Sequence, residues 1–495
     1  MANFYVRKSG SDSNNGTSPA TAWLTIGKAL GASGISSGDT VYIGSGVYRE
    51  KVNCNLVSPT AETFVIGDML GEHTGDVPGQ IRLTNYLTND KTAPTDQALL
   101  ELNGRDYLTF QNIMFHIYSN SEIYPIDTGI TLSAYIKFIE CTFFGQNVAN
   151  LDAPFLYVIG ATDTPVHWLI SRCYFFAPGY RAVSLDYSGL THTADFDADF
   201  QILNCVSVFS TSLFHINAGS FGSPRYQACG EIVRGCSIFT NSFAMYYTVA
   251  ASTRVPSIPA RFEGNFVITH DFSAPSLQAD GTGQIIAEKN LIVSGYPYLN
   301  VTEGAGSVSN GSYAVLFDTG QETLLGLNPK PIFTPSDSSP LLGFGTVFGG
   351  PTVDVLNRPR PAGGQSTLNA VGAYERHDTG IEDTSVYDSA PSSVKIIGPG
   401  DHDFELPVNP VATNITIMVQ YDANHGETNK PQVQLLANPL IGVSAETKTL
   451  TEVADIWEKI EFTQFTPTGY GVVTLRCISR AAAGNGQAWF DSITV

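Results

Sequence analysis

Short apolar phrases recur along the first 300 residues, and each contains a small residue, either cysteine or asparagine, just before its last apolar positions. Four of them contain a cysteine: 138–144 (FIECTFF), 170–176 (ISRCYFF), 202–209 (ILNCVSVF) and 233–239 (VRGCSIF). Their cysteines are separated by 32, 32 and 31 residues. Three further phrases carry asparagine instead: 112–115 (NIMF), 265–268 (NFVI) and 290–293 (NLIV). A fixed period of this size predicts a solenoid of stacked coils.

Each repeat is strand-like and cannot bury its own apolar face, so the coils must stack into one continuous interior, roughly 4.8 Å apart. Equivalent residues then lie above one another, and small polar residues suit an inward-facing bend. The sequence therefore predicts an inward ladder of seven residues: Asn112, Cys141, Cys173, Cys205, Cys236, Asn265 and Asn290. We expect the four cysteines to be stacked free thiols, and the alternative is a disulfide between neighbours.

A different pattern begins after residue 384. Apolar and polar residues alternate with a period of two in 415–421 (ITIMVQY), 433–435 (VQL), 460–462 (IEF) and 472–478 (VVTLRCI). Alternation between turn residues predicts an antiparallel β-sandwich. We therefore expect an all-β chain with a parallel β-helix over 1–376, a linker over 377–384 and a sandwich over 385–495.

Composition and charge narrow the classes of partner. Only 15% of the residues are charged, and the formal net charge is −20. A surface this acidic repels nucleic acids and anionic membranes, so we expect neither as a partner. The sequence contains no window of 18 uninterrupted apolar residues, so we expect no membrane-spanning helix. Residues 1–8 (MANFYVRK) contain no apolar core of a signal peptide, so we expect no secretory signal.

The opening segment resembles the first coil of pectate-lyase-like right-handed β-helix proteins. The resemblance rests on 4–6 (FYV), 10–12 (GSD), 15–18 (NGTS), 22–30 (AWLTIGKAL), 38–43 (GDTVYI) and 46–50 (GVYRE). It implies that the stretch around Trp23 forms a short helix capping the open end of the solenoid. Residues 24–30 do read as an amphipathic turn, and an uncovered coil would expose a strand edge.

Two further segments carry resemblances. Residues 354–361 (DVLNRPRP) and 370–375 (AVGAYE) look like the closing signature of surface-associated β-helix proteins, although Ala370 stands where an acidic residue is usual. Residues 484–495 (GNGQAWFDSITV) resemble the last strand of carbohydrate-binding-module-like jelly rolls. Neither resemblance specifies a function, because this fold hosts lyases, hydrolases, adhesins and virion spikes.

One dense acidic run is a candidate for chemistry. Asp195, Asp197 and Asp199 would alternate on one face of a strand, roughly 6.8 Å apart. That spacing suits an inverting glycosidase, and the same carboxylates could hold Ca²⁺. The alternative is a solvated outer face or a loop. Arg181 is the nearest basic residue towards the N-terminus, and no motif joins it to an acid as a lyase base. Scattered histidines, His215 among them, form no recognised motif.

The sandwich offers two further candidate sets. Aromatic rings can stack on sugars, and the candidates are Tyr421, Trp457, Tyr470 and Trp489, although some of them should belong to the core. Asp401, Asp403 and Glu405 form a possible Ca²⁺ cluster, with a loop as the alternative. We expect no other cofactor.

These features favour a binding or structural surface over an enzyme. The first hypothesis is a virion surface protein of a bacteriophage, such as a head decoration, head fibre or tail component, that adheres to surface glycans. It would be made in the host cytoplasm and assemble with other virion proteins or with itself, for instance as a trimer. The alternatives are a polysaccharide lyase or glycoside hydrolase with a carbohydrate-binding module, and a secreted extracellular adhesin.

Overall fold

A computed structural model describes the chain in segments. The described residues are 2–85, 98–119, 124–128, 133–147, 153–160, 166–176, 180–187, 196–197, 199–208, 210–217, 228–240, 243–248, 259–269, 275–279, 285–293, 297–303, 307–309, 323–324, 330–331, 393–397, 399–408, 412–425, 429–437, 442–454, 456, 458–467, 471–480 and 487–494. The chain forms two compact units. Unit 1 comprises Met1–Thr319 and Phe333–Arg376, and unit 2 comprises Gly320–Ile332 and His377–Val495.

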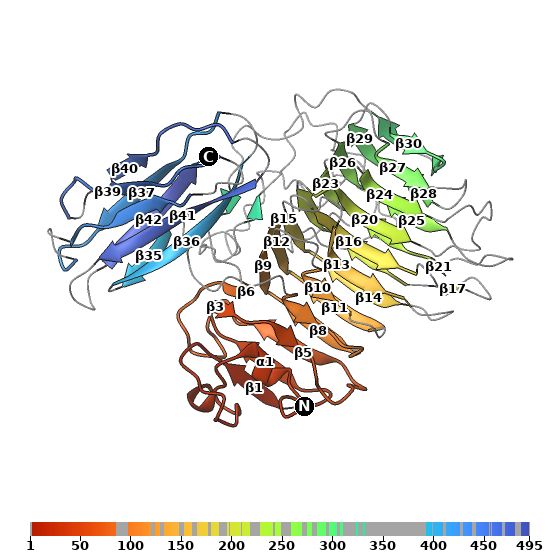
Figure 1. Ribbon diagram of the computed structural model, residues 1–495, viewed down its shortest axis with the longest axis horizontal. Helices are drawn as coiled ribbons and strands as arrows, with labels where there is room; N and C mark the ends of the chain where they lie inside the picture. The colour runs from red at the N-terminus through yellow and green to blue at the C-terminus, as the bar shows by residue number, and fades with distance from the viewer. Residues whose placement is uncertain are drawn as a thin grey trace, which may run out of the picture. The chain divides into compact units, whose positions relative to one another are not determined.

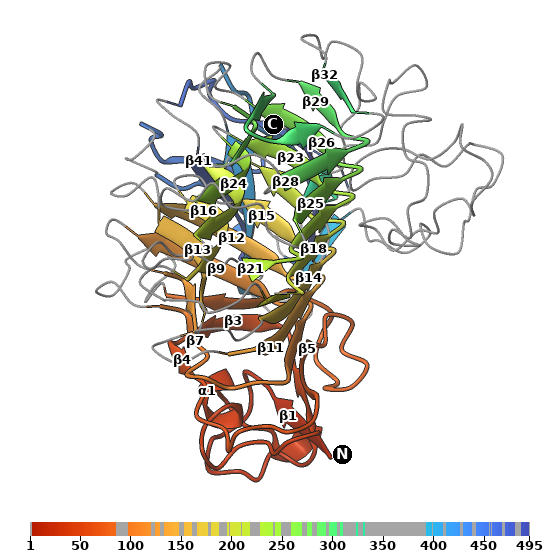
Figure 2. The same ribbon diagram turned by 90° about the vertical axis from the view of Figure 1, so that its right-hand side faces the viewer.

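Unit 1 is a right-handed parallel β-helix, as the repeat predicts. Successive strands enter three parallel sheets in turn, so the neighbours within each sheet come from consecutive coils (Figures 1 and 2). We call these sheets A, B and C.

Sheet A contains β1 (Asn3–Val6), β2 (Thr40–Ile43), β5 (Thr63–Gly67), β8 (Leu108–Gln111), β11 (Tyr135–Ile139), β14 (His167–Ser171), β18 (Gln201–Leu203), β22 (Ile232–Arg234), β25 (Ala260–Glu263), β28 (Ile285–Glu288) and β31 (Thr302–Glu303). Sheet B contains β3 (Gly46–Arg49), β6 (Ile81–Thr84), β9 (Met114–Ser119), β12 (Thr142–Asn147), β15 (Tyr174–Phe176), β19 (Val206–Val208), β23 (Ser237–Thr240), β26 (Phe266–Thr269), β29 (Leu291–Val293) and β32 (Val308–Ser309). Sheet C contains β4 (Val52–Asn53), β7 (Leu100–Glu101), β10 (Ile126–Asp127), β13 (Ala153–Ile159), β16 (Tyr180–Asp186), β20 (Ser212–Asn217), β24 (Phe243–Thr248), β27 (Leu277–Ala279) and β30 (Tyr298–Leu299). A short pair outside these sheets joins β17 (Phe196–Asp197) to β21 (Ala228–Cys229).

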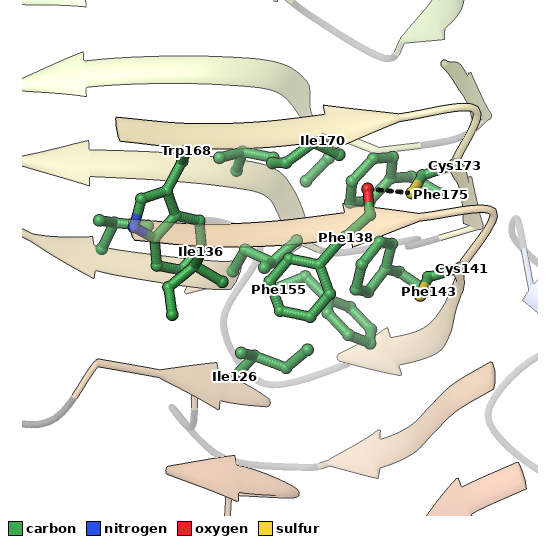
Figure 3. Close-up of a cluster of buried hydrophobic side chains, with 14 of the residues drawn as sticks. Ile126, Ile136, Phe138, Cys141, Phe143, Phe155, Trp168, Ile170, Cys173 and Phe175 are labelled. Atoms are coloured by element: carbon green, nitrogen blue, oxygen red, sulfur yellow. Dashed lines mark hydrogen bonds between the residues drawn. The ribbon is translucent and has the colours of Figure 1, made fainter. Parts of the chain in front are cut away.

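The solenoid interior is built from like residues stacked on successive coils. Phe143 of β12 stacks on Phe175 of β15 with ring centroids 4.5 Å apart (Figure 3). Phe110 stacks on Phe138 in the same way, at 5.2 Å. The register places each ring directly beside its equivalent one coil away. Because the interior positions recur once per coil, a single repeated phrase creates a continuous apolar column.

The bend between sheets A and B explains the recurring small residues. In seven consecutive coils one position of this bend has a left-handed backbone, with φ between 52° and 64°: Asn112, Glu140, Arg172, Asn204, Gly235, Gly264 and Lys289. The next residue points inward, and this column contains Ile113, Cys141, Cys173, Cys205, Cys236, Asn265 and Asn290, all 0–2% exposed. The prediction for Asn112 is therefore wrong by one position: Asn112 makes the left-handed turn, for which asparagine is well suited, and Ile113 takes the inward place.

The inward column is held by hydrogen bonds from backbone to side chain. The backbone N–H groups of Cys173 and Cys205 each donate to the Sγ of the next coil's cysteine at 3.4 Å. The N–H of Cys236 donates to Oδ1 of Asn265 at 2.8 Å, and that of Asn265 to Oδ1 of Asn290 at 2.9 Å. All four cysteines of the repeat are free thiols, so the disulfide alternative does not occur. Burial raises the pKa of Cys141 and Cys205 well above the usual thiol range, with a further rise from the neighbouring cysteine.

The N-terminal end is closed by two short helices, η1 (Pro19–Thr21) and α1 (Ile26–Ala29). Trp23 lies between them, pairs with Val6 and stacks on Phe4 with ring centroids 5.3 Å apart. Ile26 and Ala29 of α1 are buried, so the helix covers the first coil with its apolar side. The segments 354–361 and 370–375, which resemble a closing signature, lie outside the described residues.

Unit 2 contains two four-stranded antiparallel sheets. The first consists of β35 (Ser393–Ile397), β42 (Gln487–Thr494), β37 (Thr416–Tyr421) and β40 (Glu458–Glu461), and the second of β36 (Pro399–Val408), β41 (Gly471–Arg480), β38 (Gln432–Leu435) and β39 (Glu446–Thr449). A short antiparallel pair, β33 (Thr323–Leu324) and β34 (Lys330–Pro331), also belongs to this unit. Residues of both sheets, such as Val419 and Leu475, share one buried core, so the alternating pattern forms a small sandwich.

Candidate functional site

The outer face of sheet C carries a polar and aromatic row that crosses successive coils. The register aligns one residue per strand: Asn53, Glu101, Asp127, Tyr157, Ser184, His215, Tyr246 and Gln278. Their neighbours along each strand, such as Leu156 and Leu185, belong to the interior, so strand alternation places the row outside. We call these eight residues the sheet C row.

A partly buried arginine–histidine contact lies at the centre of the row. Nη1 of Arg181 is 2.9 Å from Nδ1 of His215, and Oγ of Ser184 is 3.4 Å from the same nitrogen. A guanidinium can only donate, so Nδ1 must accept and the ring proton of His215 must reside on Nε2. Burial, followed by the nearby charge of Arg181, lowers the pKa of His215 from 6.5 to about 3. His215 is thus a neutral, fixed hydrogen-bond acceptor at physiological pH.

A tyrosine–carboxylate pair lies beside this contact. The hydroxyl of Tyr157 donates to Oδ2 of Asp186 at 2.8 Å. Burial and this hydrogen bond raise the pKa of Tyr157, so the phenol stays protonated. The ring of Tyr157 also packs on Tyr124, with centroids 4.3 Å apart. Tyr157 and Asp186 are both partly exposed, so the pair combines an aromatic surface with a carboxyl group that accepts hydrogen bonds.

Further aromatic surface continues the row towards the C-terminus. Tyr246 lies 5.2 Å from His215 between ring centroids, and it stacks on Phe243 at 5.0 Å. On the N-terminal side, Lys51 forms an ion pair with Glu101 at 2.5 Å. The face therefore offers rings, hydroxyls and carboxylates along several consecutive coils.

The chemistry of this arrangement favours binding over proton transfer. Ser184 and His215 resemble a nucleophile and its base, but a histidine with a pKa of about 3 is a weak base at neutral pH. Its Nδ1 lone pair is also occupied by Arg181 at 2.9 Å. Hydrogen-bonding groups placed between aromatic surfaces instead suit a ligand rich in hydroxyls, because such a ligand needs polar partners and stacking faces together.

Of the acidic run predicted from the sequence, the structure describes one carboxylate, that of Asp199. Asp195 lies outside the described residues, and for Asp197 only the backbone in β17 is described. Asp199 has a left-handed backbone (φ 39°), which turns the chain and breaks the alternation. Its carboxylate is exposed, accepts from Nε2 of Gln201 at 2.7 Å and lies 3.3 Å from Nδ1 of His167. The expected alternation therefore does not extend to Asp199, and the spacing of Asp195 and Asp197 stays a prediction.

The structure describes the side chain of only one of the four aromatic residues predicted to stack on sugars, Tyr421. Trp457 and Tyr470 lie outside the described residues, and only the backbone of Trp489 is described, in β42. Tyr421 is fully buried and its hydroxyl donates to the Glu452 carbonyl at 3.0 Å. Its ring has no face for a sugar, so that prediction is wrong.

The predicted Ca²⁺ cluster lies on a strand. Asp401, Asp403 and Glu405 occupy alternate positions of β36, paired with β41, and their side chains are not described. Among the described residues, no group of three acidic, histidine or cysteine side chains is arranged to hold a metal ion. No helix in the described ranges is long and apolar enough to span a membrane.

Sequence reasoning missed most of the sheet C row. Tyr157, Ser184 and Tyr246 were not singled out, and His215 and Arg181 were noted without a role. The signal was their distance from the repeated cysteines: Ser184, His215 and Tyr246 follow Cys173, Cys205 and Cys236 by 11, 10 and 10 residues. Counting from the repeat would have placed them on one face.

Comparisons with known proteins show no match to a family model and none to a curated protein. Solved structures do match. XylC with xylose is 10% identical, covers 76% of this chain and 98% of its own, and has a TM-score of 0.31. Pectin methylesterase PemA from Erwinia chrysanthemi is 13% identical, with 63% and 93% covered and a TM-score of 0.27. A mutant tailspike of the E. coli bacteriophage HK620 with a pentasaccharide is 12% identical, with 91% and 86% covered and a TM-score of 0.29. At these identities and TM-scores, the three matches assign no activity to this chain.

Proposed function

We propose that this protein binds a polysaccharide along the outer face of sheet C. The observation that carries the proposal is the sheet C row, which places Tyr157, Ser184, His215 and Tyr246 on consecutive coils. Coils repeat roughly every 4.8 Å, so a linear chain lying along the row meets a new polar or aromatic group at each coil. A solenoid suits this task because its surface is extended and repetitive.

The individual contacts have distinct roles in this proposal. Tyr157 and Tyr246 supply ring surface for the C–H side of a sugar, since both are partly exposed. The carboxylate of Asp186 accepts hydrogen bonds from sugar hydroxyls, and a bond to a charged group is the stronger kind. Arg181 fixes His215 by its hydrogen bond at 2.9 Å, so the two act as a rigid floor beneath the ligand.

The wider role that we propose is a surface component of a bacteriophage virion. In this role the solenoid adheres to host or environmental glycans, as a homo-oligomer or beside other virion proteins. The sandwich of unit 2 is then a second, jelly-roll-like glycan-binding module. A secreted extracellular adhesin with the same solenoid is the alternative location. Mass spectrometry of purified virions from the source sample tests this role. We expect this chain at high copy number, and its absence from the particles would contradict the virion role.

Binding is tested by titrating acidic and neutral polysaccharides into the full chain by calorimetry, with Tyr157→Phe and Asp186→Asn as variants. Loss of a hydrogen bond to a charged group costs about 1.5–3 kcal/mol, so we expect affinity to fall roughly 10- to 100-fold. Tyr135→Phe is the control, because Tyr135 is exposed on the outer face of sheet A. Equal affinity for all four proteins, or no binding by the unmodified chain, would reject the proposal.

Activity assays with the same polysaccharides distinguish binding from catalysis. The alternative function, a polysaccharide lyase or glycoside hydrolase, is favoured by one observation: the Asp186 carboxylate lies 2.8 Å from the Tyr157 phenol, so a carboxyl group and a phenol lie in contact on the outer face of sheet C. Ultraviolet absorbance reports lyase products and a reducing-end assay reports hydrolysis. Turnover that is lost in Asp186→Asn would make the site catalytic.

A further inference from the structure

Two parallel tyrosine rings lie on the outer face of sheet A, at the start of its strands. Tyr107 and Tyr135 stack with ring centroids 4.7 Å apart and ring planes only 4° from parallel. They occupy equivalent positions of neighbouring coils, because they immediately precede the paired residues Leu108 and Ile136. Tyr135 is 40% exposed and Tyr107 is partly exposed, so both rings contact solvent.

The backbone around the two tyrosines holds this contact in place. Oδ1 of Asp106 accepts the N–H of Ala134 at 2.5 Å, which joins the residues that precede the two rings. The carbonyl of Tyr107 accepts the N–H of Thr63 at 2.8 Å. Tyr107 has φ 55°, a left-handed conformation that is an outlier for a bulky side chain. Such a conformation persists only where the surrounding structure over-determines it, so the position of this residue is fixed.

The other face of the Tyr135 ring is covered by His167. The two rings stack with centroids 4.6 Å apart and planes 12° from parallel. Nδ1 of His167 lies 3.3 Å from Oδ2 of Asp199, which holds the histidine from the next coil. Because Tyr107 covers one face of Tyr135 and His167 covers the other, a tyrosine of a second molecule has no face of this ring to stack on. A reaction between stacked phenols is therefore directed within the chain.

We propose that Tyr107 and Tyr135 form a modification site, at which a one-electron oxidant joins two coils of the solenoid. The oxidant is a haem peroxidase acting with hydrogen peroxide. Each phenol loses one electron and its proton, and the two tyrosyl radicals form a carbon–carbon bond between the carbons ortho to their oxygens. The hydrogen atoms on these carbons move to the oxygens, which restores both phenols. The chain thus loses two hydrogen atoms, and hydrogen peroxide is reduced to two water molecules.

The product is a covalent link between coils that the described cysteines do not supply. Those cysteines are buried free thiols, so none of them ties one coil to the next. The two tyrosines lie 28 residues apart in the sequence. A cross-link that closes such a loop restricts the unfolded chain, in the same way as a disulfide does. The oxidised protein should therefore resist unfolding more than the untreated protein.

Two other tyrosine pairs have less suitable geometry. Tyr5 and Tyr42 are farther apart, at 6.0 Å between centroids, and their planes are 28° from parallel. Tyr124 and Tyr157 are close, at 4.3 Å, but their planes are 37° from parallel. Coupling requires the ortho carbons of both rings to meet, and parallel rings hold them together over the whole ring edge. We therefore expect more coupling between positions 107 and 135 than within either of these pairs.

Oxidation of the dilute full chain with a haem peroxidase and hydrogen peroxide tests the site. We expect dityrosine fluorescence and, in a digest, a linked pair of peptides that contains positions 107 and 135 and has lost two hydrogen atoms. The yield of this pair should fall about tenfold or more in urea, because the unfolded chain no longer holds the rings together. The absence of this pair, or an equal yield in urea, would overturn the proposal.

A variant that keeps the stack separates this site from other tyrosines. Tyr135→Phe retains a ring but has no phenol to oxidise, so the linked peptides should disappear. Tyr42→Phe is the matched control in another pair of the same sheet, and it should leave their yield unchanged. Oxidation should raise the urea midpoint of the unmodified sequence and of Tyr42→Phe, but not that of Tyr135→Phe. Equal dityrosine fluorescence in both variants would contradict the site, and midpoints that do not move would contradict its stabilising effect.

Discussion

His215 shows how one solenoid position can keep a titratable ring uncharged. The residue is 7% exposed and accepts a hydrogen bond from Arg181 at 2.9 Å. Burial and the arginine charge lower its pKa to about 3, whereas an unfolded histidine titrates near 6.5. Protonation of the folded state would place two positive groups in contact away from water, so the ring stays neutral and its geometry stays fixed.

This shift predicts a pH dependence of stability. Between pH 6.5 and 3 the unfolded chain holds a proton that folded His215 does not, so stability is complete above pH 6.5 and falls as the pH drops. The full difference is on the order of 4 kcal/mol. The variant His215→Asn keeps an acceptor near the Nδ1 position but has no titrating ring, so its stability should not fall in this way. The difference in free energy of unfolding between the unmodified protein and this variant should therefore shrink between pH 7 and pH 4. Denaturant midpoints at several pH values measure it.

Ser184→Ala provides the control for this prediction. Ser184 contacts the same Nδ1 at 3.4 Å, and its hydroxyl does not titrate in this range. Its stability difference from the unmodified protein should therefore not depend on pH. A difference for His215→Asn that is equally constant would show that the ring is not held neutral.

At the scale of the element, the bend between sheets A and B is the unit that repeats. In the bends from Cys205 to Asn290, a left-handed residue is followed by an inward residue whose side chain accepts a backbone N–H from the preceding coil. Cysteine and asparagine can both accept this bond, which explains why both occur in one column. Glu140, Arg172 and Lys289 occupy the left-handed position without the freedom of glycine, and each then costs roughly 1–2 kcal/mol.

The left-handed column predicts opposite effects for neighbouring glycine substitutions. Lys289 has φ 52°, so Lys289→Gly should raise the free energy of unfolding by about 0.5–1 kcal/mol. Glu288 is the last residue of strand β28, and Glu288→Gly should lower it by a similar amount, because glycine weakens a strand. Urea unfolding of both variants measures the sign. If Lys289→Gly destabilises the protein as much as Glu288→Gly does, Lys289 does not have a left-handed backbone conformation.

The bend also shows how far the sequence could predict the structure. The cysteine phrases revealed the β-helix because the inward position keeps one small residue type over four coils. Asn112 was misplaced because asparagine suits both the left-handed turn and the inward column. The sheet C row was missed because its residue type changes at every coil, from Tyr157 to Ser184 to His215. The loop before Tyr157 is also longer, since that residue follows Cys141 by 16 positions.

At the scale of the whole chain, the two units have separate cores. The division into units falls at Arg376 and His377, next to the polar stretch 377–384. A boundary between two cores carries few stabilising contacts, so its backbone is a good substrate for a protease.

Limited proteolysis of the native chain should therefore cut first within 376–384 and release a folded C-terminal fragment of about 115 residues. The solenoid fragment should persist. Mass spectrometry of the early products locates the cut. First cleavage inside the sheets of unit 1, between 98 and 309, would show that the solenoid is not one continuous cooperative body.

The inward column sets which insertions and deletions the chain can accept. Its members are separated by 32, 32, 31, 29 and 25 residues from Cys141 to Asn290, although the strands keep their register. Length differences are therefore absorbed outside the bend. Removing 142–173 would join Cys141 to Tyr174, which already follows the equivalent Cys173, and would delete one whole coil with every later side chain on its proper face. Removing one residue fewer would reverse the faces of the joined strand. Evolutionary change in this chain should thus proceed by whole coils and by turn length.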